Sequence, residues 1–155
     1  MYDELVVCRA DASNVETLKV LCAEHAAYER LPHSADTRTD ALAAALDDMP
    51  PRLHAWIARI GDEAIAYASA TVDFSTLDGA TYLHMDCLYV RKDWRGHAIG
   101  LRLWEALRTF AQSHGCQAMQ WQTPSWNVDA ARFYRRLGAI ESTKLRYRFP
   151  LDGGD

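Results

Sequence analysis

The chain has 155 residues, of which 49% are hydrophobic and 25% charged, a composition typical of one globular domain with a sizeable core. Its net charge of −4 argues against non-specific nucleic-acid binding, and no apolar run approaches the ~18 residues that a membrane-spanning helix needs. The four cysteines form no CxxC pair and the six histidines no HxxxH pair, so we expect no structural metal.

The cysteine pattern, and the lack of a charged-then-apolar stretch at the N-terminus, favour a cytoplasmic protein. The charge is unevenly distributed along the chain. Residues 1–90 carry 15 acidic and 6 basic side chains, whereas residues 91–155 carry 6 acidic and 11 basic ones. Such a chain could hold a cationic ligand against one part and an anionic ligand against the other, or it could have two solvated surfaces that differ.

Hydrophobic periodicity and capping residues predict a single domain over residues 1–155 that mixes strands and helices. Asp11 and Ser13 offer N-caps for the first helix, and Gly115 and Gly138 stand where later helices should end. In chain order we expect a strand at 5–9, helices at 11–30 and 41–49, strands at 54–60, 64–74 and 81–90, a helix at 98–114, a strand at 116–122, a helix at 128–137 and a last strand at 139–149. This order, β-α-α-β-β-β-α-β-α-β, predicts an α/β fold with one mixed, mostly antiparallel sheet flanked by helices.

The middle of the chain contains a strand that runs into a glycine-containing turn and then a helix. The strand ends at Val90, the turn reads Arg95-Gly96-His97-Ala98-Ile99-Gly100, and a strongly periodic helix follows. The first amides of a helix have no partners within it, and the helix dipole is positive at that end, so such a junction binds anions. The sequence therefore predicts a phosphate site at this turn.

Two motifs make this prediction more specific. Residues 95–100 follow the pattern [RQ]-x-x-G-x-[GA] with alanine at its first glycine, and residues 127–138 fit N-x-x-A-x-x-F-Y-x-x-x-G, in which Asn127 should cap the helix. Together they resemble the GCN5-related N-acetyltransferase (GNAT) family, whose acetyl-CoA signature is the first pattern. Tyr28-Glu29-Arg30, the turn at 93–96 and the pattern at 126–136 are most similar to the spermidine/spermine (diamine) and thialysine N-acetyltransferases of that family.

The resemblance implies a GNAT fold with splayed central strands and acetyl-CoA as co-substrate. The backbone of Leu88 and Val90 would pair with the pantetheine arm, and the Val90 amide would polarise the thioester carbonyl. The alternative for both residues is plain core packing. The full set of coenzyme-binding residues implied by the resemblance is Leu88, Tyr89, Val90, Arg95, Gly96, His97, Ala98, Ile99, Gly100, Asn127, Tyr134 and Arg136.

The acceptor implied by the resemblance is a primary amine, which has to lose a proton before it attacks. His84 and Asp86 share one face of the central strand and are the candidate bases, with a water chain as the alternative. Tyr134 matches the family's general-acid tyrosine. Each could instead be structural: a buried hydrogen-bond partner, a satisfied histidine or an aromatic packed beside Phe133. The side chains expected to line the acceptor side are Glu24, Tyr28, Glu29, Asp36 and Asp86.

The chain departs from the resemblance at two positions. Cys87 stands where the most similar subfamily has the second of two adjacent acidic residues, so one carboxylate is lost. Ala98 stands where the family usually has glycine, and its methyl group is expected to crowd the approach of a pyrophosphate to the backbone.

The sequence thus indicates an enzyme that transfers an acetyl group from acetyl-CoA to a polyamine or lysine-like small molecule by direct attack in a ternary complex. Two alternatives remain open: a non-catalytic acyl-CoA-binding module, and acetylation of protein or peptide amines. The resemblance also implies a homodimer. We expect no nucleic acid, membrane or metal as a partner.

Overall fold

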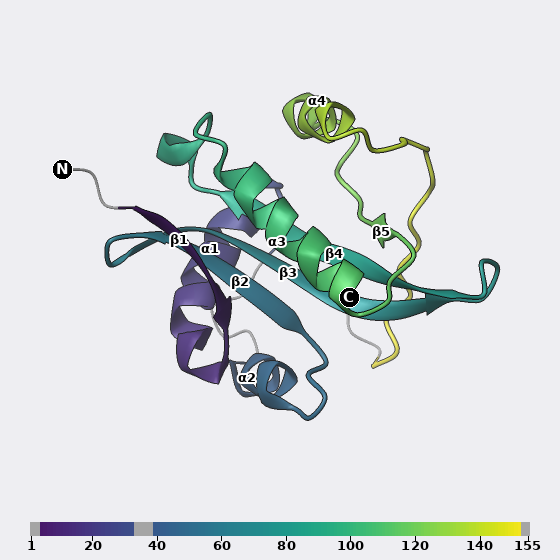
Figure 1. The fold of residues 1–155 in the computed structure, drawn as a ribbon, viewed down its shortest axis with the longest axis horizontal. Coiled ribbons are helices and arrows are strands. Elements are labelled where there is room, and N and C mark those ends of the chain that lie inside the picture. Colours follow the sequence, from purple (N-terminus) through teal and green to yellow (C-terminus); the bar gives the residue numbers. More distant parts are fainter. Residues whose placement is uncertain (1–3, 33–38, 153–155) are drawn as a thin grey trace. The chain divides into compact units, whose positions relative to one another are not determined.

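A computed structural model describes residues 4–32 and 39–152. It divides into two compact units, Met1–Gln122 and Thr123–Asp155, which are described separately. The first unit contains a five-stranded sheet in the order β1-β2-β3-β4-β5 (Figure 1). Its strands are β1 (Leu5–Ala10), β2 (His54–Ile60), β3 (Glu63–Ser75), β4 (Ala80–Val90) and β5 (Met119–Gln120). The first four are antiparallel and β5 runs parallel to β4, which confirms the mixed, mostly antiparallel sheet.

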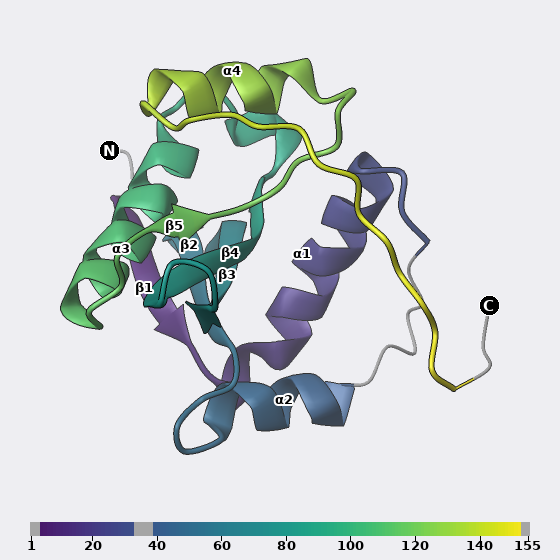
Figure 2. The same ribbon diagram turned by 90° about the vertical axis from the view of Figure 1, so that its right-hand side faces the viewer.

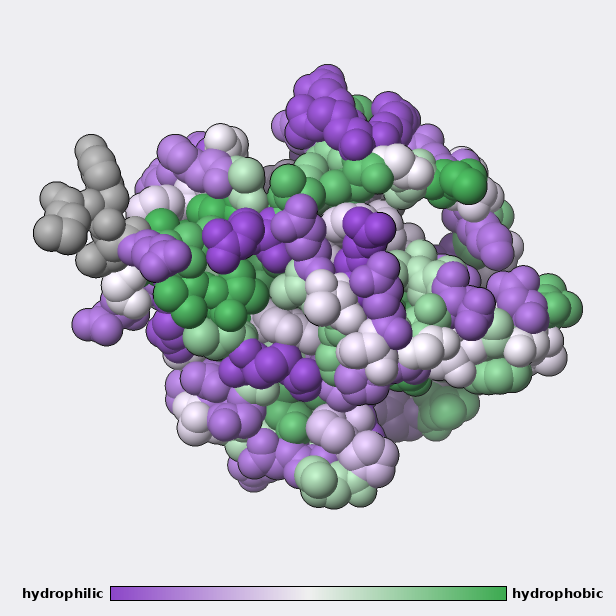
Figure 3. All heavy atoms as spheres, viewed as in Figure 1, coloured by the Kyte–Doolittle hydropathy of each residue, from purple (hydrophilic) through white to green (hydrophobic). Residues whose placement is uncertain are grey.

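Helices cover both faces of this sheet (Figure 2). Helices α1 (Val15–Tyr28) and α2 (Thr39–Asp47) lie on one face and α3 (Ile99–Ser113) on the other. On the first face, Leu21 packs in a buried cluster with Ile57 and Tyr67 of the sheet. Helix α3 buries every fourth residue, as its sequence period predicts; these residues are Ile99, Leu103, Leu107 and Ala111. The surface in Figure 3 mixes hydrophilic and apolar residues, as is usual for globular proteins.

The helices of the first unit begin and end largely where local chemistry predicts. Asp11 caps a short 3₁₀ turn, η1 (Ala12–Asn14), that precedes α1. Gly115 follows α3 with φ 71°, and its amide donates to the Gln112 carbonyl at 3.3 Å. Helix α1 ends in the same kind of motif, but there the left-handed position is occupied by Arg30, with φ 61°. None of the helices within 4–32 and 39–152 has the length and hydropathy to cross a membrane.

Strand β4 contains an extra residue at the centre of the sheet. Ser69 pairs with Cys87, but the next residue of β3, Ala70, pairs with Met85, so Asp86 has no partner on β3. This is a β-bulge, which bends a strand and redirects side chains. On the other side, β5 pairs with β4 only at Leu83 and His84. Strands β4 and β5 therefore separate after His84, which confirms the expected splay.

The second unit contains helix α4 (Val128–Arg136). The side chain of Asn127 accepts from the Ala130 amide at 3.2 Å, so the predicted N-cap is confirmed. Gly138, with φ 91°, follows the helix as predicted. The prediction of a strand at 139–149 is wrong: residues 139–150 have neither helical nor strand conformation. An alternating sequence gives a segment two faces, but a strand exists only when a second strand pairs with its backbone.

Candidate active site

The end of β4 presents backbone groups along the open edge left by β5. The Arg91 amide donates to the Ile65 carbonyl at 2.9 Å, so this pair faces the β3 side. In an antiparallel ladder every second residue does so. Because Ala66 pairs with Val90 and Ala68 with Leu88, the backbone groups of Leu88 and Val90 point away from β3. This geometry suits pairing with an extended chain at the positions that the sequence predicted.

The turn after β4 leads into the N-terminus of α3. It contains a 3₁₀ turn, η2 (Lys92–Trp94), followed by Gly96 with φ 84° and Ala98 with φ 61° and ψ 20°. The first hydrogen bond of α3 runs from the Arg102 amide to the Ala98 carbonyl at 3.1 Å. The amides before Arg102 have no carbonyl partner within the helix. A Cβ at Gly96 would have no neighbour within 4 Å among the described residues. The residues therefore fit a pyrophosphate.

The side chain of Arg95 lies on the α1 side of this turn. Its Nε donates to the Val90 carbonyl at 2.9 Å, and its guanidinium carbon lies 4.4 Å from the centre of the Tyr28 ring. The Tyr89 ring is on the same side, 5.8 Å from that carbon. Cation–π contacts of this kind contribute about 0.5–1 kcal/mol at exposed sites. We therefore expect the backbone amides of the turn, more than the Arg95 guanidinium, to contact a phosphate.

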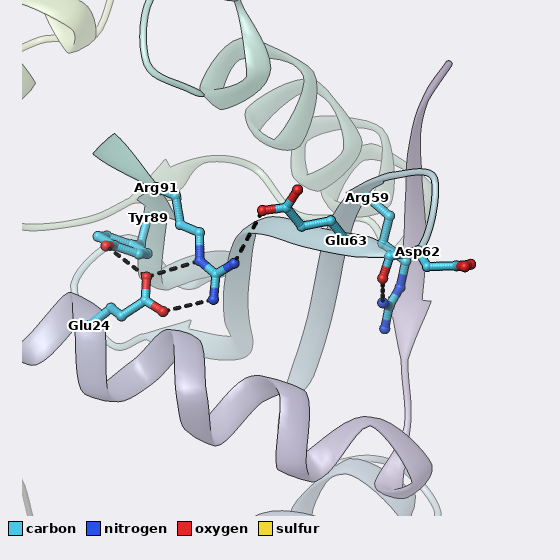
Figure 4. A network of polar contacts seen from close by, with 6 residues as sticks. All are labelled: Glu24, Arg59, Asp62, Glu63, Tyr89 and Arg91. Carbon is cyan, nitrogen blue, oxygen red and sulfur yellow. Dashed lines mark hydrogen bonds and ion pairs between the residues drawn. The ribbon is translucent and has the colours of Figure 1, made fainter. Parts of the chain in front are cut away.

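Glu24 forms an ion-pair network that joins α1 to the end of β4 (Figure 4). Its carboxylate accepts from Arg91 Nε at 3.0 Å and Nη2 at 2.8 Å, and from the Tyr89 hydroxyl at 3.3 Å. Arg91 also reaches Glu63, at 3.6 Å. The Arg59–Asp62 contact drawn beside them is separate. The charge of Glu24 is thus balanced within the protein, and the substrate contact predicted for it stays a prediction.

His25 is a residue of this region that sequence reasoning missed. Its Nε2 lies 2.6 Å from Glu29 Oε2, and its Nδ1 lies 2.7 Å from the hydroxyl of Tyr67. Its ring stacks on Tyr89, with centroids 5.2 Å apart and planes 22° apart. The spacing of His25 and Glu29, four residues apart on one helix, could have indicated this pair. No sequence signal indicated the contact with Tyr67 on β3.

Two thiols surround the same hydroxyl. The thiols of Cys22 and Cys87 lie near Tyr67 and interact electrostatically with its hydroxyl. Burial raises the pKa of Tyr67, and it raises the pKa of Cys87 to about 12, with the charge of Asp86 adding to the effect. The Cys87 thiol is therefore protonated at neutral pH and is a poor nucleophile. Cys87, which stands where the similar subfamily has its second acidic residue, is therefore a neutral side chain.

The candidate bases lie side by side. His84 Nε2 is 3.8 Å from Asp86 Oδ1. The Asp86 side chain is 58% exposed, because its bulged position turns it out of the regular ladder. It lies close to α1, since its charge opposes the effect of burial that lowers the pKa of His25. A carboxylate that is both accessible and next to an imidazole can accept a proton from a bound amine.

The other predicted site residues lie in the turn before α3 and on α4. His97 lies beside Trp94, with ring centroids 6.1 Å apart. Tyr134 is on α4 next to Phe133, and Arg136 is in the last turn of that helix. Their roles stay predictions. Asp36 lies outside the described residues. No group of three His, Cys, Asp or Glu side chains in the described ranges is arranged to hold a metal ion.

Comparison with known proteins identifies the family. Residues 18–139 match the model of the Acetyltransferase (GNAT) family. A thialysine N-epsilon-acetyltransferase of Caenorhabditis elegans is 28% identical over 152 residues, which cover 97% of this chain and 92% of that protein. The Mus musculus enzyme of the same name is 27% identical over 138 residues, with 81% of each chain covered.

Solved structures show the same fold. The aminoglycoside N-acetyltransferase AAC(6')-Iy in complex with CoA superposes with a TM-score of 0.82 at 17% identity, over 96% of this chain and 95% of that one. An aminoglycoside acetyltransferase from an uncultured soil metagenomic sample, in complex with sisomicin, gives a TM-score of 0.81 at 16% identity, over 95% and 96%. At these identities the likeness establishes the fold alone.

Proposed function

This chain belongs to the GNAT family and is an N-acetyltransferase, and we propose that it moves the acetyl group of acetyl-CoA to a primary amine of a small, lysine-like or polyamine molecule. The observation that carries the proposal is the junction of β4 and α3. Outward-facing backbone at Leu88 and Val90 is followed within ten residues by a left-handed turn at a helix N-terminus. One part suits an amide-rich arm and the other a pyrophosphate.

The chain's own groups would hold the coenzyme in the following way. Amides of residues 96–100 would receive the pyrophosphate, each dipole contact contributing only ~0.3–1 kcal/mol, so that several must converge. Leu88 and Val90 would pair with the pantetheine amides. The Val90 amide would donate to the thioester oxygen, where negative charge develops. Acetyl-CoA supplies the activated acetyl group. Asn127 and Arg136 would add contacts to the coenzyme, as the family resemblance implies.

Asp86 would take a proton from the acceptor amine, directly or through a water. An alkylammonium has a pKa near ~10.4, so at pH 7 the neutral amine costs about 4–5 kcal/mol. The exposed carboxylate of Asp86 and the His84 imidazole 3.8 Å away support this role. The neutral amine would then attack the carbonyl carbon in a ternary complex, without an acyl-enzyme.

Tyr134 would complete the transfer. As the carbon–sulfur bond breaks, the thiolate of coenzyme A needs a proton, and a phenol can donate it. Tyr134 would recover that proton from solvent. Support for this role comes from the match of residues 127–138 to the family's helix.

An amine panel tests the proposal. The protein is incubated with acetyl-CoA and, separately, with thialysine, lysine, spermidine, spermine, aminoglycosides and a lysine-containing peptide, and thiol release is followed. We expect turnover with at least one small amine. Tight coenzyme binding by calorimetry without turnover on any amine would instead favour a non-catalytic acyl-CoA-binding module, and turnover on the peptide alone would favour protein acetylation.

Two further proposals concern the oligomeric state of the enzyme and its location in the cell. We propose a homodimer, as the family resemblance implies, and light scattering of the purified protein would test it. We also propose a cytoplasmic location. Its support is that all four cysteines are free, which suits a reducing compartment.

A further inference from the structure

His25 lies in a partly buried polar chain that joins α1 to the sheet. Its side chain is 12% exposed and that of its partner Glu29 is 20% exposed. Both ring nitrogens are engaged, Nε2 with Glu29 at 2.6 Å and Nδ1 with Tyr67 at 2.7 Å. Buried polar groups with short contacts on both sides fix the orientation of a side chain. His25 therefore holds the Glu29 carboxylate in one position.

The hydrogen-bond chemistry sets the tautomer. An ionised carboxylate can only accept, so His25 Nε2 carries a proton and donates it to Glu29. In the neutral imidazole Nδ1 is then an acceptor and receives the proton of the Tyr67 hydroxyl. If His25 gains a second proton, Nδ1 becomes a donor, and the Tyr67 hydroxyl has to accept from it and turn its own proton away. Rotation of this hydroxyl is enough to accommodate the second charge state of His25.

These two states differ in what Glu29 offers to a ligand. With neutral His25, the carboxylate keeps its negative charge. With protonated His25, the carboxylate is neutralised by a partly buried partner at 2.6 Å. The other acidic side chain of the network, Glu24, is already balanced by Arg91 in both states. Between these two carboxylates, only the charge of Glu29 depends on His25.

We propose that His25 is a positioning residue for the acceptor: it aims the Glu29 carboxylate at a cationic substrate and releases that substrate when it becomes protonated. This inference rests on the proposed function, because it assumes that the substrate is an ammonium bound on this face. Sequence resemblance suggested Glu29 as an acceptor residue, whereas the control by His25 and Tyr67 comes from the contacts. Asp86 would remain the group that receives the proton.

The surroundings of His25 favour its neutral form near pH 7. The groups that face it are Glu29 and Cys22 from α1, Tyr67 from β3, and Asp86, Cys87 and Tyr89 from β4. Burial lowers the pKa of His25, although the charges of Glu29 and Asp86 act in the opposite direction. Near neutral pH the charge of Glu29 is therefore not offset by His25, and the cationic substrate loses its partner as the pH falls into the range where His25 is protonated.

Steady-state kinetics over pH 5–8.5 test the proposal, with saturating acetyl-CoA and the best amine of the panel. In the wild-type protein we expect KM for the amine to rise as the pH falls, by up to about tenfold per pH unit below the pKa of His25, with a smaller change in kcat. His25→Gln keeps a donor for Glu29 but cannot titrate. It should have a KM within about threefold of wild type at pH 8 and should lose the acid rise. Glu29→Gln should raise KM about tenfold or more at every pH.

His54→Gln is the matched control. His54 is another partly buried histidine, it contacts Arg9 at 2.9 Å and Phe110 on the α3 side, and burial lowers its pKa as well. This variant should keep the wild-type KM profile. The proposal is overturned if the rise in KM at acid pH is absent from the wild-type protein or if the pH changes kcat alone. It is also overturned if the rise persists in His25→Gln or if His54→Gln abolishes it too. Absence of turnover with every amine would instead reject the proposed function.

A histidine NMR titration gives a readout that does not need turnover. In Glu29→Gln the nearby negative charge is lost, so the pKa of His25 should fall further below that in wild type. An unchanged or higher pKa in that variant would show that the two side chains are not coupled and would overturn the proposal. Because Glu29 follows the last turn of α1, this substitution leaves the buried apolar core intact.

Discussion

The guanidinium of Arg91 donates two hydrogen bonds to the carboxylate of Glu24, of 3.0 and 2.8 Å. This bidentate pair connects α1 to the end of β4, next to the strand edge proposed to bind the coenzyme. About two thirds of each side chain is shielded, so the pair is stronger than an ordinary surface ion pair.

Glu24→Gln should therefore act mainly on stability. We expect a loss of about 1 kcal/mol in the free energy of unfolding, measured in urea, because the variant breaks a two-bond, partly shielded contact. Glu63→Gln is the control: Glu63 approaches Arg91 only to 3.6 Å and is more exposed, so its loss should change stability little. A normal unfolding curve for Glu24→Gln, together with a large increase in KM for the amine, would show that Glu24 binds substrate instead.

Ala98→Gly should stabilise the protein. Ala98 has φ 61°, a left-handed conformation that glycine adopts without cost and other residues do not. We expect a gain of about 1 kcal/mol and a higher Tm, together with tighter coenzyme binding where the methyl group crowds a phosphate. Ala106→Gly, the same change inside α3, should destabilise by about 1 kcal/mol. A lower Tm for Ala98→Gly would contradict this account of the turn.

Stability should decrease as the medium becomes mildly acidic. Burial lowers the pKa of both His25 and His54, so the unfolded chain takes up protons before the folded one does. The free energy of unfolding should therefore fall as the pH drops below the ordinary histidine pKa of ~6.5, toward the lower folded values. Urea unfolding at pH 7.5 and 5.5 measures this, and His25→Gln should show a smaller difference. An equal difference in that variant would indicate that other groups are responsible.

Thiol reactivity should separate the cysteines. Cys8 is exposed, whereas burial raises the pKa of Cys87 to about 12. With iodoacetamide at pH 8, peptide mapping should find Cys8 modified first and Cys87 only after unfolding, because the thiolate is the reacting species. Cys8→Ser should remove the early modification. Rapid alkylation of Cys87 in the native protein would contradict the raised pKa and partly buried position of this thiol.

Local patterns in the sequence predicted much of the fold. The spacing of Ile99, Leu103 and Leu107 predicted the buried face of α3, and the helix ends at Gly115 and Gly138 were predicted from the backbone freedom of glycine. These features depend on neighbours within one turn of a helix. The turn at the N-terminus of α3 was predictable for the same reason.

Features that depend on distant partners were not predictable. Tyr67 lies 42 residues from His25 in the chain, and nothing in either local sequence marks their contact. The bulge at Asp86 results from the register between β3 and β4, which alternation alone does not determine. For the segment at 139–149, the pattern described the two faces of a strand, but no pattern ensures that a partner strand pairs with it.

The proposed mechanism is direct transfer of an acetyl group from acetyl-CoA to an amine within a ternary complex. The alternative is a ping-pong mechanism through an acetylated enzyme. Initial rates measured with acetyl-CoA and the amine both varied distinguish the two most directly, because they give different double-reciprocal plots. Cys87 is protonated and partly buried, and the edge at Leu88 and Val90 is open, so we predict lines that intersect. Parallel lines, together with an acetylated protein isolated in the absence of amine, would contradict the claim.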